Sequence, residues 1–229
     1  MPHSIHQTII RFPEIQLAIR DAHKLRGYFG MLFQEHSQLL HNHLESGESA
    51  YRYPLVQYKV LDGVPTLVGL KEGADLLIQL FLKIKELQIE QRTYPVFQKN
   101  IESKIVTIGL TDDLIAYRFQ TLWMALSQQN YREYLAEDDE RKGKHLKSIL
   151  TGNLLSFFKA MDYRADGTVM VNLKITNQRE TQFKNNAMLA FEASFVTNAL
   201  LPGYVGLGKS VARGFGSIIL ENLNDHLQK

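Results

Sequence analysis

Hydrophobic and polar positions recur with two different periods over the first 90 residues, and together they predict an α+β fold. A β-type run at Gln7–Phe12 is followed by apolar residues at 4-3-4-3 spacing, which draws one face of a helix. This face comprises Ala18, Ala22, Leu25, Phe29, Leu32 and Phe33. Two strand-like runs, Leu55–Val60 and Val64–Gly69, follow and are joined through Asp62-Gly63. That dipeptide is a strong hairpin signal because both residues tolerate positive φ.

A second helix and a closing strand complete this first unit. The helix is marked by Ala74, Leu77, Ile78, Phe81 and Ile84. The run Leu87–Glu90 can supply the last strand, which gives the order β-α-β-β-α-β of a ferredoxin-like fold. We therefore expect an N-terminal ferredoxin-like domain over residues 1–94, ending in the polar, proline-containing segment Gln91–Lys104.

Residues 95–229 are predicted to form a second, distorted ferredoxin-like domain. Strands are expected at Lys104–Ile108 and Leu114–Leu122, around a turn at Thr111-Asp112-Asp113, before a polar helix at Ser127–Glu140. A better-marked helix has an apolar face of Leu146, Leu150, Leu154, Phe157 and Met161. The remaining predicted strands are Thr168–Thr176, Ala187–Thr197 and, after a glycine-rich segment, Phe215–Leu220. The predicted fold class is α+β with two tandem ferredoxin-like domains.

Composition narrows the class of protein. With 45% hydrophobic and 22% charged residues, the chain is too apolar for intrinsic disorder. No run of 18 uncharged apolar residues occurs, and the first ten residues lack the pattern of a signal peptide, so we expect no membrane span and no secretion. The absence of cysteine excludes disulfides and thiolate chemistry and favours a reducing cytoplasm.

Charge is distributed unevenly along the chain. Residues 1–140 carry 14 Lys and Arg against 18 Asp and Glu, whereas residues 141–229 carry 12 against 6. Nine of the basic residues fall between Arg141 and Lys184. A basic C-terminal half indicates an anionic partner on that side, although the same residues also fit an ordinary solvated surface.

The segment Gly203–Ser210 satisfies the P-loop pattern G-x4-G-K-[ST] letter for letter. That pattern binds nucleotides when it joins a buried parallel strand to a long helix. Only 19 residues follow Ser210, and they contain two more glycines. We therefore reject a nucleotide hydrolase.

Over a wider window the same segment reads G-x-G-x5-G-x-G, from Gly206 to Gly216, and encloses Lys209 and Arg213. Four glycines in eleven residues allow a backbone to fold closely against a ligand and to direct its amides at phosphate oxygens. The two cations add charge-assisted contacts. The alternative is a glycine-rich turn that simply enters the last strand.

This loop, near the end of a chain with two predicted ferredoxin-like domains, resembles that of the CRISPR repeat-processing endoribonucleases of the RAMP superfamily. The resemblance implies a metal-independent, cofactor-free endoribonuclease that cuts CRISPR repeat RNA in precursor transcripts. Cleavage in the family proceeds by attack of a ribose 2′-hydroxyl and leaves a cyclic phosphate. The implied partners are CRISPR repeat RNA, other CRISPR complex subunits and a second copy of the chain. The alternative function is a non-catalytic RNA-binding subunit of a CRISPR ribonucleoprotein.

The candidate catalytic residues fall in an unusually long connection, Gln34–Pro54, between the first helix and the second strand. In an extended segment the side chains of His41 and His43 leave on the same side, whereas in a helix they diverge by about 200° and cannot cooperate directly. Imidazole can serve as base or acid near neutral pH. The family places catalytic histidine at a similar position, and its third catalytic partner is often Tyr or Lys. Tyr51 is the candidate here, although packing explains it equally well. A metal site that adds His36 is an unspecific alternative.

One further catalytic candidate and a set of RNA-binding candidates remain. Lys59 is a further catalytic candidate that can also be read as facing solvent from its strand. The acidic run Glu137–Glu140 limits the path of an RNA strand because it repels phosphate. The predicted RNA-binding residues are Gly206, Gly208, Lys209, Arg213, Gly214, Gly216, Lys142, Lys144 and Lys147.

Overall fold

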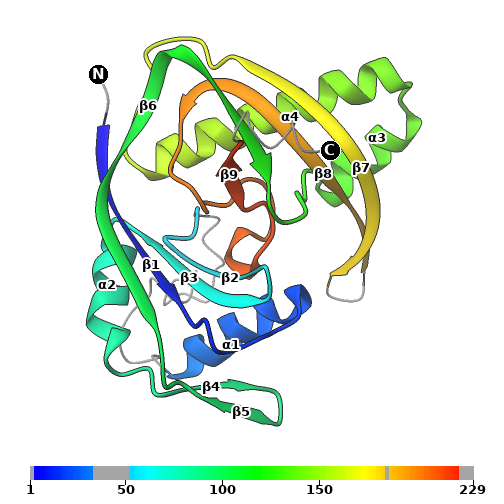
Figure 1. Ribbon diagram of the computed structural model, residues 1–229. Helices are drawn as coiled ribbons and strands as arrows, with labels where there is room; N and C mark the ends of the chain where they lie inside the picture. The colour runs from blue at the N-terminus through cyan, green and yellow to red at the C-terminus, as the bar shows by residue number, and fades with distance from the viewer. Residues whose placement is uncertain (1–2, 33–51, 184–185, 222–229) are drawn as a thin grey trace, which may run out of the picture. The chain divides into compact units, whose positions relative to one another are not determined.

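The computed structural model describes residues 3–32, 52–183 and 186–221 (Figure 1). The chain divides into two compact units. The N-terminal unit holds the described residues of 4–106 together with Val211–Gly214. The C-terminal unit holds the described residues of 107–210 and 215–221, together with His3. A short segment from near the end of the sequence therefore belongs to the N-terminal unit.

The N-terminal unit is built on an antiparallel sheet. Its elements are β1 (His3–Arg11), η1 (Ile19–Asp21), α1 (Ala22–Leu32), β2 (Val56–Leu61), β3 (Val64–Leu70), α2 (Glu72–Phe81) and the first part of β6 (Asn100–Phe119). The strand order is β2-β3-β1-β6, so β2 is an edge strand and β1 lies between β3 and β6. This order and the alternation of strands and helices are ferredoxin-like, as predicted.

One turn of this unit confirms the sequence prediction, and one strand differs from it. Asp62 and Gly63 both adopt positive φ, of 50° and 83°, and connect β2 to β3 with Leu61 opposite Val64, which confirms the predicted hairpin. The predicted closing strand Leu87–Glu90 instead pairs outside the sheet. It becomes β4 (Glu86–Ile89), which forms a two-stranded hairpin with β5 (Arg92–Pro95).

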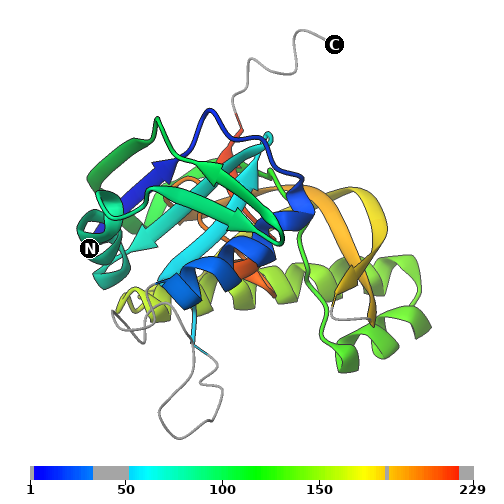
Figure 2. The ribbon, with the colours of Figure 1, turned by 90° about the horizontal axis from the view of Figure 1, so that it is seen from below.

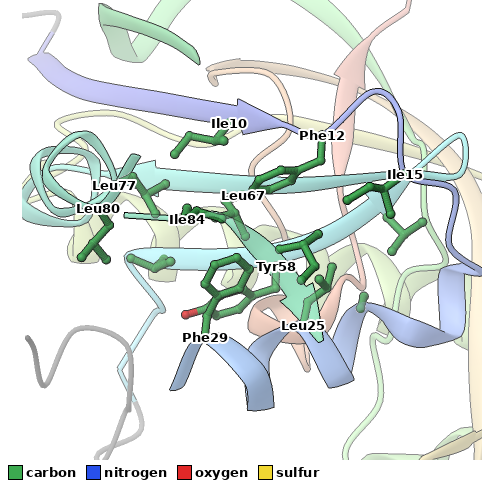
Figure 3. Close-up of a cluster of buried hydrophobic side chains, with 14 of the residues drawn as sticks. Ile10, Phe12, Ile15, Leu25, Phe29, Tyr58, Leu67, Leu77, Leu80 and Ile84 are labelled. Atoms are coloured by element: carbon green, nitrogen blue, oxygen red, sulfur yellow. The ribbon is translucent and has the colours of Figure 1, made fainter. Parts of the chain in front are cut away.

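One face of the sheet carries the main core of the N-terminal unit (Figure 3). In Figure 2, α1 (blue) crosses the cyan strands β2 and β3. The ring of Phe29 on α1 stacks on Phe12 and Tyr58, with centroid distances of 6.5 and 5.8 Å. Leu77 and Leu80 of α2 are also buried in this cluster. Burial of these side chains stabilises the unit and fixes α1 on the sheet.

The C-terminal unit contains the rest of β6 and three further antiparallel strands. The long strands β7 (Val171–Phe183) and β8 (Asn186–Leu200) pair with each other, β8 pairs with β6, and β9 (Ile218–Leu220) pairs with β6 at Tyr117–Phe119. The predicted turn at Thr111-Asp112-Asp113 is wrong. These residues lie inside β6, where the register with β8 shifts between Leu110 and Ile115, so an irregularity in the pairing accommodates the polar residues without ending the strand.

Two helices complete the C-terminal unit. The predicted helix Ser127–Glu140 is shorter: α3 (Gln128–Ala136) ends early, and α4 (Asp139–Ala160) begins within the acidic run. Asp138 is the N-cap of α4, and its Oδ1 accepts a hydrogen bond of 2.9 Å from the Arg141 amide. The predicted apolar face of α4 is confirmed, because Leu146, Leu150, Leu154 and Phe157 are buried.

The predicted domain boundary after residue 94 falls within β5, whereas the N-terminal unit continues to Val106. The first part of β6 supplies the fourth strand of the N-terminal sheet, so the chain leaves that unit only in the middle of β6.

None of the helices in residues 3–32, 52–183 and 186–221 is both long and apolar enough to cross a membrane.

Candidate functional site

The glycine-rich segment 206–216 is divided between the two units. Val211–Gly214 belongs to the N-terminal unit, and the residues on either side belong to the C-terminal unit. The 3-10 helix η2 (Val211–Arg213) contacts α1 and β2. Ser210 is followed by this short turn and then by β9, so the rejection of a P-loop helix is confirmed.

Glycines allow this segment to pack closely against the rest of the chain. Gly208 has a φ of +96°, and a Cβ there would lie 2.7 Å from the Met124 carbonyl oxygen. Gly214 has a φ of +93°, and a Cβ would lie 2.6 Å from the Ala22 Cβ on α1. Both positions therefore need glycine for positive φ and for close approach.

Several backbone amides of the segment already donate to protein carbonyls. The Lys209 amide donates to the Met124 oxygen at 2.8 Å, and the Gly216 amide donates to the Leu122 oxygen at 2.9 Å. The Gly214 amide donates to the Val211 oxygen at 3.3 Å. These three amides are therefore not available to donate to phosphate as the glycine pattern had predicted. The cationic side chains of the segment become the stronger candidates for RNA contact.

Arg213 is influenced electrostatically by a second arginine. It is half-buried on η2, and burial, followed by the positive charge of Arg26 on α1, lowers the pKa of its side chain. Arginine stays charged in proteins, so the two guanidinium groups repel each other. An anion bound next to both would relieve that repulsion, and phosphate matches the planar donor fork of arginine.

The candidate catalytic residues His41, His43 and Tyr51 lie outside the described residues, as does His36. Their connection is anchored to the N-terminal unit at both described ends. It follows α1, which ends at Leu32, and it leads into β2, which begins at Val56. These are the two elements that η2 contacts.

The side chain of Lys59 does not face solvent as one interpretation of the sequence had it. It lies in β2, where every residue from Val56 to Leu61 is buried, and its own exposure is 0%. Its Nζ has no hydrogen-bond partner among the described residues. Burial lowers the pKa of this amine to about 7. A solvent-facing role is therefore wrong, because the strand is buried on both faces.

The basic run at the start of α4 is largely paired with the acidic run before it. Lys144 Nζ lies 2.6 Å from Glu140, Lys142 Nζ lies 3.8 Å from Asp139, and Arg141 Nε lies 3.5 Å from Asp138. RNA phosphates would have to displace these carboxylates to contact Lys142 or Lys144. Lys147 is exposed and forms no ion pair with a described residue, so it can contact an RNA phosphate without first losing a carboxylate partner.

Arg26 was missed by the sequence analysis. Arg26 stands among other basic residues on α1, and nothing in that pattern indicates an RNA-binding role. Its electrostatic interaction with Arg213, 187 positions further along the chain, depends on the return of η2 to α1. Among residues 3–32, 52–183 and 186–221, no group of three or more His, Asp or Glu side chains could hold a metal ion.

Comparisons with protein families cover nearly the whole chain. A family model described as the Cas6b N-terminal domain matches residues 3–107. A second, described as the Cas6b C-terminal domain, matches residues 109–220.

Solved structures give the same result. A crystal structure of Cas6b is 33% identical, with a TM-score of 0.89, and the match covers 96% of this chain and 100% of that chain. A crystal structure of the CRISPR RNA processing endoribonuclease Cas6b is 29% identical, with a TM-score of 0.78 over 96% and 100% of the two chains. An uncharacterized protein from Methanocaldococcus jannaschii is 33% identical over 141 residues, which are 62% of this chain and 96% of that protein.

Proposed function

The chain belongs to the Cas6b family, and from this premise we propose that it is a metal-independent endoribonuclease that cleaves CRISPR repeat RNA. The proposed activity is supported by the similar Cas6b structure that is described as a CRISPR RNA processing endoribonuclease. The RNA is the substrate, and mature guide RNA is the product.

The proposed reaction needs three groups. A base accepts the proton of a ribose 2′-hydroxyl, which attacks the adjacent phosphorus in line. An acid protonates the leaving 5′-oxygen, so the products are a 2′,3′-cyclic phosphate and a free 5′-hydroxyl. His41 and His43 divide these two roles, since imidazole exchanges protons near neutral pH. Tyr51 donates a hydrogen bond to a non-bridging phosphate oxygen.

The observation that carries this proposal is the pair Arg213 and Arg26. The pair lies on η2 and α1, and α1 leads directly into the histidine-bearing connection. Two cations that repel each other favour a phosphate bound to both, and they stabilise the extra negative charge that develops on it during in-line attack. The same unit thus supplies an anion site and both anchors of the proton-transfer residues.

Purified protein is expected to cut repeat RNA in the presence of excess EDTA. Replacing the 2′-hydroxyl at the cleaved position by hydrogen removes the nucleophile, so this substrate is expected to bind but not to be cut. Denaturing gels of single-turnover reactions measure both results. Tight binding without cleavage of the all-ribose RNA would instead support the non-catalytic RNA-binding subunit.

Replacing Lys209 and Arg213 together by alanine is expected to weaken RNA binding and to flatten its salt dependence. Each lost phosphate contact lowers the slope of log K against log salt by about 0.7 to 0.9. Filter binding over a series of salt concentrations measures the slope. Lys24→Ala is the matched control, because Asp21 and Glu90 already neutralise Lys24 at 2.6 and 2.8 Å. An unchanged slope in the double variant would reject the proposed phosphate contacts.

A further inference from the structure

A chain of hydrogen bonds on the N-terminal sheet joins a serine, a histidine and an aspartate that the proposed function does not use. His6 Nε2 lies 2.6 Å from Ser103 Oγ, and His6 Nδ1 lies 2.7 Å from Asp75 Oδ1. The three residues come from β1, from the first part of β6 next to it, and from the first turn of α2 (Figure 1).

The chemistry of the partners fixes the direction of these hydrogen bonds for a neutral imidazole. An ionised carboxylate can only accept, so Nδ1 carries the proton and donates to Asp75. Nε2 is then left to accept the hydroxyl proton of Ser103. The hydroxyl of Thr8, which is fully buried, lies 3.0 Å from Ser103 Oγ and can donate to it.

The arrangement has the order of contacts by which a base activates a serine nucleophile: carboxylate, imidazole and hydroxyl, each within hydrogen-bond distance of the next. Such a constellation is recognised by geometry and not by position in the sequence. Ser103 is exposed, and the side chain of His6 is only 26% exposed, so the nucleophile can be reached while the base is held in place.

We propose that Ser103 is an activated nucleophile that accepts acyl groups from small carboxylic esters, with His6 as general base and Asp75 as the residue that orients it. This activity is independent of RNA cleavage. Ser103 Oγ attacks the carbonyl carbon while its proton passes to His6 Nε2. The tetrahedral intermediate then expels the alcohol, which takes the proton from His6. Water, activated by His6 in the same way, releases the carboxylic acid and restores the serine.

A fluorophosphonate probe tests the nucleophile directly, because it forms a stable bond to activated serines and releases fluoride. Intact-mass measurement is expected to show one added group, and peptide mapping is expected to place it on Ser103. General-base catalysis contributes about 10²–10⁴-fold, so His6→Gln should slow labelling by at least 10²-fold. Asp75→Ala should slow it less, and p-nitrophenyl acetate should be hydrolysed by the wild type and not by Ser103→Ala.

Ser156→Ala is the matched control, because Ser156 is also exposed but lies on α4, and this variant should be labelled like the wild type. A merely structural link between β1, α2 and β6 would give no modification of Ser103. Folded wild-type protein that stays unlabelled would overturn the proposal, and the assay needs no RNA, so its outcome is separate from that of the endoribonuclease.

Discussion

Replacing His41 and His43 together by alanine is expected to reduce single-turnover cleavage of repeat RNA by about 10²–10⁴-fold, the usual contribution of general acid–base catalysis. RNA affinity should change little, because the phosphate contacts that dominate binding are proposed for lysine and arginine side chains elsewhere in the chain. The variant therefore separates chemistry from binding. Gel-based cleavage rates and filter-binding affinities on the same preparations measure the two effects.

His23→Ala provides the control for this experiment. His23 lies on α1 outside the connection, is exposed, and its Nδ1 lies 2.6 Å from the Arg20 carbonyl oxygen. Its removal should leave the cleavage rate unchanged. The single variants His41→Ala and His43→Ala then show how the two proton roles are divided. If both single variants and the double variant cut at the wild-type rate, the assignment of the catalytic histidines is wrong even when the protein is an endoribonuclease.

Elements whose signals are local were predictable from the sequence. The turn Asp62-Gly63 forms the expected hairpin because positive φ at both positions is a property of those residues themselves. The face of α4 is buried as expected because residues three and four apart share one side of any helix. The ferredoxin-like class follows from the order of such elements along the chain.

Choices that depend on distant partners were not predictable. The run Leu87–Glu90 has the composition of a sheet strand, but Leu87 pairs with Tyr94 in a separate hairpin, while the first part of β6 takes the outer place beside β1. The polar residues after Leu110 resemble a turn, yet pairing with β8 continues past them through a shift of register. In each case tertiary pairing outweighs the local preference.

In the candidate site, too, features set by neighbouring residues were predictable and features set by distant partners were not. The glycine pattern and Arg213 are visible in the sequence because they are close neighbours there. The electrostatic interaction between Arg213 and Arg26 depends on the return of η2 to α1, which no local spacing encodes. The ion pairs of Lys142 and Lys144 with the acidic run were within reach of sequence analysis, since opposite charges three and four residues apart meet on a helix. The roles of His41, His43 and Tyr51 stay predictions.

The free energy of unfolding is expected to rise by about 3 kcal/mol between pH 7 and pH 9.5 because of Lys59 alone. The pKa of this amine is about 7 in the folded protein, against an ordinary value of 10.5. Between these two values the unfolded chain binds more protons than the folded one, so stability increases with pH. Below about pH 7 both states are protonated, the slope vanishes, and the full cost of a buried charge remains.

Lys59→Met removes the titrating amine and nearly preserves its shape, so the variant should be more stable than the wild type at pH 7 and should lack the rise. Urea unfolding at the two pH values measures this difference. The same substitution at exposed Lys147 should leave the slope unchanged. Burial also lowers the pKa of Lys99, and any slope from that residue is common to both proteins and cancels in the comparison. A Lys59→Met protein with the wild-type slope would show that Nζ reaches water or an anion in solution. A loss of RNA cleavage in the stabilised variant would assign Lys59 to the reaction, because a purely structural amine leaves the cleavage rate unchanged.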